Sequence, residues 1–253
     1  MIDYGADMFM LVHGAYHGSW CWEPLIERLK SRGHAAVAPD LPGHADKDGW
    51  LGQQEMSSYI NAIADLVKGM ETPPVLVGHS MSGAVVSGVA EQCPDALEQV
   101  IFLAAYIPAD GECLADLAKI DPASHAQMNK VEVNGITAVS IKQGNLGDAF
   151  YNDATPDQLA WVEDRIKLQA ARTFRAPVTL SDKNFGRVKK SAIVCTRDRA
   201  ISVAHERWMA ERAGCDPIVE LDTGHSPFVT APDALADEVI RDLERRGLLN
   251  GGF

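Results

Sequence analysis

The segment at residues 78–83 (GHSMSG) constrains the fold of this chain more than any other part of the sequence. It follows the apolar run at 74–77 (PVLV) and precedes the small-residue segment at 84–90 (AVVSGVA), which together predict a strand, a sharp turn and a helix. Such a turn strains the backbone of its apex residue, here Ser80, and small neighbours tolerate that strain. The pattern departs from G-x-S-x-G by one position, because Ser82 stands where the second glycine is usual. A plain strand-loop-helix connection also fits the motif alone, so the rest of the chain has to decide.

The residues that a serine nucleophile requires follow Ser80 in the order acid and then histidine. The run at 191–196 (SAIVCT) predicts a buried strand that leads to Asp198, and the run at 217–221 (PIVEL) predicts another that leads to His225. Loops after parallel strands meet at one edge of the sheet, so these side chains are expected to lie together. Asp222 is the alternative acid. Asp198 is preferred, because the acid usually precedes the histidine by a whole helix-strand unit.

A second loop is suited to stabilising negative charge. The run at 8–12 (MFMLV) predicts a strand that ends in the segment 13–18 (HGAYHG). Acyl transfer develops charge on a carbonyl oxygen, which requires fixed N–H donors. We expect one donor from the backbone of Met81, the residue after the nucleophile, and the other from Ala15, where Gly14 permits close backbone approach.

Three stretches resemble the plant methylesterase and hydroxynitrile lyase family, which includes methyl salicylate esterase and bacterial relatives. They are residues 13–22 (HGAYHGSWCW), the GHSMSG segment, and 185–190 (FGRVKK) running into 193–198 (IVCTRD). The resemblance covers nearly the whole chain and is weakest at about 107–150. It implies an α/β-hydrolase fold, a Ser80-His225-Asp198 triad and an oxyanion hole formed by the N–H groups of Ala15 and Met81.

Apolar runs alternate with helical segments along most of the chain. Strands are predicted at 8–12, 35–39, 74–78, 99–104, 191–196 and 217–221, and helices near 20–32, 56–70, 81–92, 202–213 and 231–246. The fold class is therefore α/β, with a mainly parallel six-stranded sheet flanked by helices. We expect residues 1–105 and 181–253 to form the core and 106–180 to form an inserted cap. Within the cap, 131–140 predicts a hairpin around Asn134-Gly135.

Composition limits the partners of the chain. Its 253 residues, 46% of them hydrophobic, can bury a large core as one domain. A net charge of −12 without a basic cluster argues against binding nucleic acid or a membrane. The acidic segment 1–7 does not resemble a signal peptide, and we expect a cytoplasmic protein. The five cysteines form no C-x-x-C pair and are expected to be reduced, buried thiols rather than metal ligands. The sequence does not decide between a monomer and a homodimer.

Several aromatic and glycine positions are candidates for the substrate pocket. Phe150, Tyr151, Trp161 and Phe174 either line it or pack within the cap. Gly14 and Tyr16 belong to the loop at its edge. Other residues have simpler interpretations: His13, His17, His44 and His79 order loops or pack, and Trp20, Trp22 and Trp208 pack between helices and sheet.

The expected function is therefore hydrolysis of a small apolar or aromatic ester through an acyl-enzyme, with no cofactor and no metal. Three alternatives stay open. A hydroxynitrile lyase is disfavoured, because that branch has Thr where this chain has Gly14 and Lys where it has Ser226. A hydrolase of another carboxyl or carbon-carbon bond would use the same triad. A non-enzymatic ligand receptor is the third alternative, and it is disfavoured because a protein that only binds a ligand does not need an intact triad.

Overall fold

A computed structural model describes residues 8–45, 50–245 and 247 of the chain. The segment 1–7, for which the sequence predicts no signal peptide, lies outside these residues. Residue 246, the last of the final predicted helix, lies outside them as well.

The core is built on one sheet whose six strands run parallel in the order β2-β1-β3-β4-β8-β9. The strands are β1 Met8–Val12, β2 Ala35–Val37, β3 Val75–His79, β4 Gln99–Leu103, β8 Lys190–Cys195 and β9 Ile218–Leu221. β3 and β4 are buried along their whole length, whereas the edge strands β2 and β9 are partly exposed. Continuous apolar runs therefore form the central strands, as expected where helices cover both faces. The predicted sheet is confirmed.

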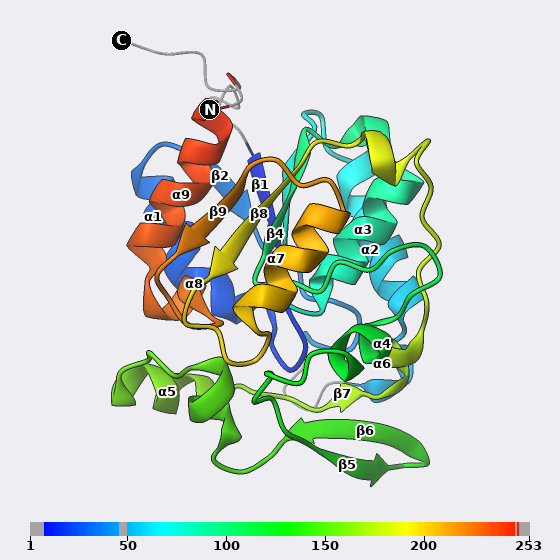
Figure 1. The fold of residues 1–253 in the computed structure, drawn as a ribbon, viewed down its shortest axis with the longest axis vertical. Helices are drawn as coiled ribbons and strands as arrows, with labels where there is room; N and C mark the ends of the chain where they lie inside the picture. Colours follow the sequence, from blue (N-terminus) through cyan, green and yellow to red (C-terminus); the bar gives the residue numbers. More distant parts are fainter. Residues whose placement is uncertain (1–7, 46–49, 246, 248–253) are drawn as a thin grey trace.

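Helices cover the two faces of this sheet. α1 and α9 lie on one side, and α2 and α3 lie on the other (Figure 1). The core helices are α1 Glu23–Ser31, α2 Met56–Lys68, α3 Ser82–Gln92, α7 Val203–Arg212, α8 Pro227–Thr230 and α9 Pro232–Arg245. Short 3-10 turns are at Ser19–Trp22, Leu51–Gln53, Pro94–Ala96 and Phe185–Arg187.

One tryptophan differs from its predicted role. Trp208 was expected to pack between helix and sheet, but it is 40% exposed on α7. Its ring stacks on His205, and the Arg212 guanidinium lies over it. Trp208 therefore covers polar neighbours on the outer side of α7 instead of the sheet. Trp22, in contrast, is fully buried as predicted.

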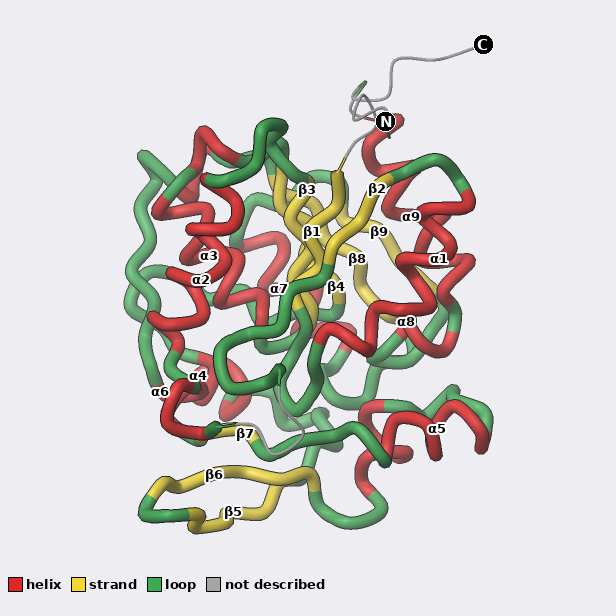
Figure 2. Tube along the Cα trace, turned by 180° about the vertical axis from the view of Figure 1, so that it is seen from behind, coloured by secondary structure: helices red, strands yellow, loops and turns green. Residues whose placement is uncertain are grey.

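The chain between β4 and β8 lies across the edge of the sheet where the strands end (Figures 1 and 2). It contains a small antiparallel sheet of β5 Met128–Val133, β6 Ile136–Ile141 and β7 Gln169–Ala170. Asn134 and Gly135 join β5 to β6 with φ values of +50° and +76°, the left-handed conformation that a two-residue hairpin turn needs. The hairpin is thus present at the predicted turn. The remaining helical segments here are α4 Leu114–Lys119, a π-helical turn Leu146–Phe150, α5 Pro156–Glu163 and α6 Arg172–Arg175.

The cysteines match the expectation from the sequence. All five cysteines are buried free thiols. None of the helices in the described part of the chain has the length and apolar character needed to cross a membrane.

Candidate active site

Ser80 occupies the turn between β3 and α3 in a strained conformation. Its φ is +53°, in the left-handed region that residues with a side chain rarely adopt. Backbone hydrogen bonds hold it there: the Ser80 carbonyl accepts the N–H groups of Gly83 and Tyr106, each at 3.1 Å. The strain is thus maintained by α3 on one side and by the chain after β4 on the other.

The displaced glycine of the motif has a steric explanation. A Cβ at Gly83 would lie 2.1 Å from the Tyr106 carbonyl oxygen, so that position requires glycine. A Cβ at Gly78 would lie 2.7 Å from a methyl carbon of Val86. Ser82 has room for a side chain, and its hydroxyl donates a hydrogen bond to the carbonyl of His13. Ser82 therefore ties the serine turn to the loop after β1.

His225 and Asp198 form a buried pair at the ends of β9 and β8. The His225 Nδ1 to Asp198 Oδ2 distance is 2.6 Å, and the two side chains are 1% and 0% exposed. Asp198 Oδ1 also accepts the N–H groups of Ala200 at 2.6 Å and Ile201 at 3.0 Å. Three donors thus satisfy this carboxylate. With its proton on Nδ1, His225 has Nε2 available as a base.

The alternative acid, Asp222, lies away from this pair. Its side chain is 85% exposed and forms an ion pair with Arg197 at 3.0 Å. The structure therefore brings together His225 and Asp198, and it leaves Asp222 on the surface.

Two other residues hold the loop that carries His225. His79, the residue before Ser80, has its Nε2 atom 3.0 Å from the carbonyl oxygen of His225. The N–H of Gly224 donates to Asp153 Oδ2 at 2.6 Å, a contact from the segment between β4 and β8. Sequence reasoning did not identify Asp153, because nothing local to it marks a contact across 71 residues.

The loop after β1 approaches Ser80 closely. A Cβ at Gly14 would lie 2.8 Å from His79 Nδ1 and 3.0 Å from Ser80 Cβ, which explains the glycine. Ala15 and Met81 line the same cavity as Ser80 and His225. Among the described residues, no acceptor takes the backbone N–H of Ala15 or Met81. Both amides are therefore available to a ligand in the cavity.

His17 orders this loop through both ring nitrogens. Nδ1 lies 2.7 Å from the Ala15 carbonyl, and Nε2 lies 2.6 Å from the Tyr151 hydroxyl. Since a carbonyl can only accept, Nδ1 carries the proton and Nε2 accepts from the tyrosine. Burial lowers the pKa of His17 to about 4, so the ring is neutral near pH 7.

The cavity above Ser80 has a volume of about 340 Å³, within the usual range for small-molecule sites. Of the candidate pocket residues, Tyr16, Phe150 and Phe174 line it, whereas Gly14, Tyr151 and Trp161 are not among its lining residues. Trp161 instead packs edge-on against Trp20, with ring centroids 5.2 Å apart. The lining also includes side chains that sequence reasoning did not identify: Tyr106, Leu114, Ala118, Ala126, Met128, Lys130, Val139, Arg175 and Ile201.

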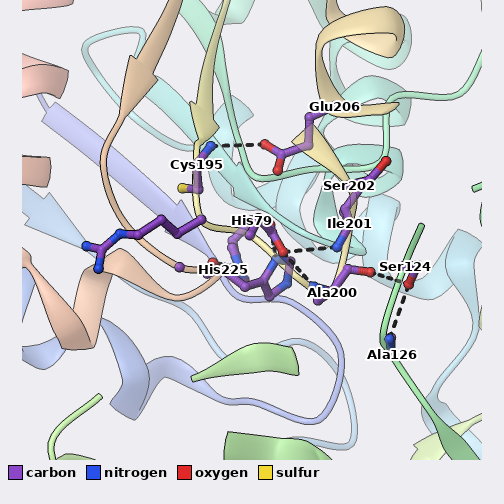
Figure 3. A network of polar contacts seen from close by, with 12 residues as sticks. His79, Ser124, Ala126, Cys195, Ala200, Ile201, Ser202, Glu206 and His225 are labelled. Carbon is purple, nitrogen blue, oxygen red and sulfur yellow. Dashed lines mark hydrogen bonds and ion pairs between the residues drawn. The ribbon is translucent and has the colours of Figure 1, made fainter. Parts of the chain in front are cut away.

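A further buried carboxyl group, that of Glu206, lies on α7. Figure 3 shows Glu206 directed toward Cys195, the last residue of β8, whose N–H donates to Glu206 Oε2 at 3.3 Å. Glu206 is 3% exposed. The sequence of α7 contains two glutamates, and nothing in it indicates that Glu206 is buried while Glu211 is exposed.

Comparison with known proteins agrees with this geometry. The sequence matches the model of the Alpha/beta hydrolase family over residues 9–238. The chain belongs to this family. The match spans the serine turn and the loops that carry Asp198 and His225.

Its relatives include named esterases. Methylesterase 2 of Arabidopsis thaliana is 26% identical over 249 residues, covering 92% of this chain and 94% of that protein. The pyrethroid hydrolase of Sphingobium wenxiniae is 26% identical over 239 residues, covering 91% and 85%. The chain spans 63% of the length of one chloroplastic relative from Arabidopsis thaliana. The resemblance to plant methylesterases is confirmed, and the chain is a carboxylic ester hydrolase.

Solved structures share the fold. A pyrethroid hydrolase from Sphingobium faniae has a TM-score of 0.81 at 23% identity, covering 96% of this chain and 100% of its own. Tomato methylketone synthase I, complexed with 2-tridecanone, has a TM-score of 0.82 at 22% identity, covering 95% and 98%. At this identity the likeness establishes the α/β-hydrolase fold and nothing about substrates.

Proposed function

We propose that the chain cleaves the ester of a small, largely apolar acid or alcohol through a Ser80-His225-Asp198 triad and an acyl-enzyme. The observation that carries this proposal is the strained Ser80 in the same cavity as His225, whose Nδ1 is held by Asp198. The apolar lining supports an apolar substrate body. The esterase names of the relatives support the reaction type.

The first half of the mechanism forms the acyl-enzyme. His225 Nε2 takes the proton of the Ser80 hydroxyl as Ser80 Oγ attacks the ester carbonyl carbon. The N–H groups of Ala15 and Met81 donate to the developing oxyanion. The imidazolium then gives its proton to the leaving alcohol as the ester C–O bond breaks.

The second half repeats these steps with water. His225 takes a proton from water as the water oxygen attacks the acyl carbon, and the imidazolium then returns that proton to Ser80 Oγ as the bond between Oγ and the acyl carbon breaks and the acid leaves. Asp198 holds the required His225 tautomer and stabilises the imidazolium throughout. The loop after β1 supplies the Ala15 donor and the turn after β3 supplies the Met81 donor, so both are in place before substrate binds and little reorganisation is needed during the reaction.

The direct test is the turnover of p-nitrophenyl and aryl methyl esters of graded acyl length by wild type and Ser80→Ala. We expect the substitution to lower kcat by about 10³-fold or more, because it removes the nucleophile. Ser87→Ala is the matched control, since Ser87 lies on α3 and its hydroxyl bonds to the Gly83 carbonyl, outside the cavity lining.

Labelling distinguishes a covalent mechanism from other uses of the triad. An organophosphonate should label wild type and Ser87→Ala stoichiometrically and leave Ser80→Ala unlabelled. Undiminished turnover by Ser80→Ala would overturn the acyl-enzyme. Cyanide release from mandelonitrile, with ester hydrolysis at background, would identify a lyase instead.

A further inference from the structure

The cavity contains two cationic side chains and no acidic one among its lining residues. Lys130 comes from β5 and Arg175 from the end of α6. Within the part of the chain that the structure describes, neither side chain has a hydrogen bond or ion pair with a carboxylate. Most other arginines pair with acids, for instance Arg212 with Glu112 at 2.7 Å. Lys130 and Arg175 are both solvent-exposed, and two cations without a carboxylate partner in the cavity above Ser80, in a chain with a net charge of −12, favour an anionic ligand.

Lys130 lines the cavity from β5, in the small antiparallel sheet. β5 is the strand of the small sheet that lies farthest from the six-stranded sheet (Figure 1). Met128 and Lys130 are two residues apart on β5, so their side chains lie on the same face of the strand. Both line the cavity, and so does Val139, the residue paired with Lys130 on β6. Ser80 lines the same cavity from the turn after β3, a strand of the six-stranded sheet. Apolar side chains, including Phe150 and Phe174, also line the cavity.

This arrangement is suited to a substrate with two unlike ends. We infer that the preferred substrate is a monoester with an apolar body and a carboxylate at the end remote from the scissile ester. The inference rests on the proposed function, because it assumes that the ester carbonyl lies at Ser80. The carboxylate then lies near Lys130 and Arg175, and the apolar body contacts the aromatic lining.

The test compares three methyl esters of equal chain length: the monomethyl ester of an α,ω-dicarboxylic acid, its dimethyl ester and the methyl ester of the fatty acid. Wild type should have the highest kcat/KM for the monoester, mainly through a lower KM. Lys130→Gln and Arg175→Gln should each lower that value about three- to fivefold, and the double variant about tenfold. The two neutral esters should change little, and added salt should reduce the preference in wild type.

Lys142→Gln is the control, because Lys142 is an exposed cation of the same hairpin region that bonds to Gln127 and does not line the cavity. Equal kcat/KM for charged and neutral esters, with labelling of Ser80 intact, would overturn the carboxylate subsite and leave the proposed function standing. Absence of hydrolysis of all three esters, together with no labelling of Ser80, would overturn both.

A second inference rests on an independent observation, the carboxyl group of Glu206. Glu206 Oε2 accepts the Cys195 N–H, while Oε1 is buried without a donor among the described residues. The side chain contacts Asp198, an acid that already accepts from His225, Ala200 and Ile201. Two carboxylates cannot bond to each other, so this contact is a hydrogen bond when one of them carries a proton. Asp198 has three donors and Glu206 has one, which assigns the proton to Glu206.

The electrostatics agree with this assignment. Burial, and then the charge of Asp198, raises the pKa of the Glu206 carboxyl well above its usual range. The other titratable groups that act on Glu206 or its surroundings are Asp121, Cys195, Tyr106 and His205. None of them supplies a cation that would favour an ionised Glu206, since burial lowers the pKa of His205.

We propose that Glu206 is a positioning residue that, as a neutral carboxylic acid, donates a hydrogen bond to Asp198 and so orients it toward His225. Glu206→Gln keeps an N–H donor for Asp198 and an oxygen acceptor for Cys195, whereas Glu206→Leu removes both. We expect Glu206→Gln to retain kcat within about threefold and Glu206→Leu to lose about 10- to 100-fold in kcat with little change in KM. Glu211→Leu, on the exposed side of α7, is the control.

The pH dependence of stability is a second readout. Because its folded-state pKa is raised, Glu206 costs stability as pH rises from about 4.3 toward that pKa. The Tm of Glu206→Gln should therefore exceed that of wild type by an amount that grows between pH 5 and 8. A Tm difference independent of pH, or wild-type kcat in Glu206→Leu, would overturn the proposal.

Discussion

At the scale of single residues, the choice between two aspartates depends on which one lies within reach of His225. Both follow a strand, and both precede the histidine in the sequence. Asp198 lies 2.6 Å from Nδ1 and is buried, whereas Asp222 is exposed and paired with Arg197. The rule that the acid precedes the histidine by a helix-strand unit predicted this contact. Its physical basis is that neighbouring parallel strands, β8 and β9, end side by side.

Substitution of each aspartate gives a direct test of this choice. Asp198→Asn should lower kcat by about 10³- to 10⁴-fold, because the amide favours the wrong tautomer of His225. Asp222→Asn should change kcat less than twofold and serves as the matched control. The measurement is kcat for a p-nitrophenyl ester at pH 7.5, with circular dichroism to verify folding. The reverse ranking would assign the acid to Asp222.

At the scale of elements, the core could be predicted because each strand is encoded by its own apolar run. A parallel strand covered on both faces needs continuous apolar residues, so the six segments were recognisable without their neighbours. The hairpin was recognisable for a similar local reason, the Asn134-Gly135 turn. β7 was not predicted, since its two residues, Gln169 and Ala170, are too few to form a pattern.

The pocket could not be read from the sequence in the same way. Phe174 and Trp161 are both aromatic residues of the segment between β4 and β8, yet Phe174 lines the cavity and Trp161 packs on Trp20. Which of them faces Ser80 depends on how α5 and α6 pack against the core, and this is a tertiary contact with no local signature. The same holds for Lys130, whose placement depends on the register of β5 against β6.

At the scale of the whole molecule, buried histidines make stability depend on pH. Burial is the largest cause that lowers the pKa values of His13, His17, His44 and His79, which surround the serine turn and the loop after β1. Neighbouring histidines contribute further, because the rings of His13 and His44 lie 4.9 Å apart. The folded state therefore holds these rings neutral at a pH where the unfolded chain protonates them.

The sign of the effect follows from proton counting. Below a pH of about 6.5 the unfolded chain binds more protons at these four histidines than the folded protein, so the free energy of unfolding should fall as pH falls. Each histidine contributes at most about 1.4 kcal/mol per pH unit, and Glu206 opposes the trend by about the same amount. Urea unfolding at pH 7.5, 6.5 and 5.5 should thus show a loss of about 2–4 kcal/mol per unit below pH 6.5 at constant m-value. His125→Gln, whose side chain is 56% exposed, should leave that slope unchanged. A free energy of unfolding that stays flat or rises over this range would contradict the neutral histidine cluster around Ser80.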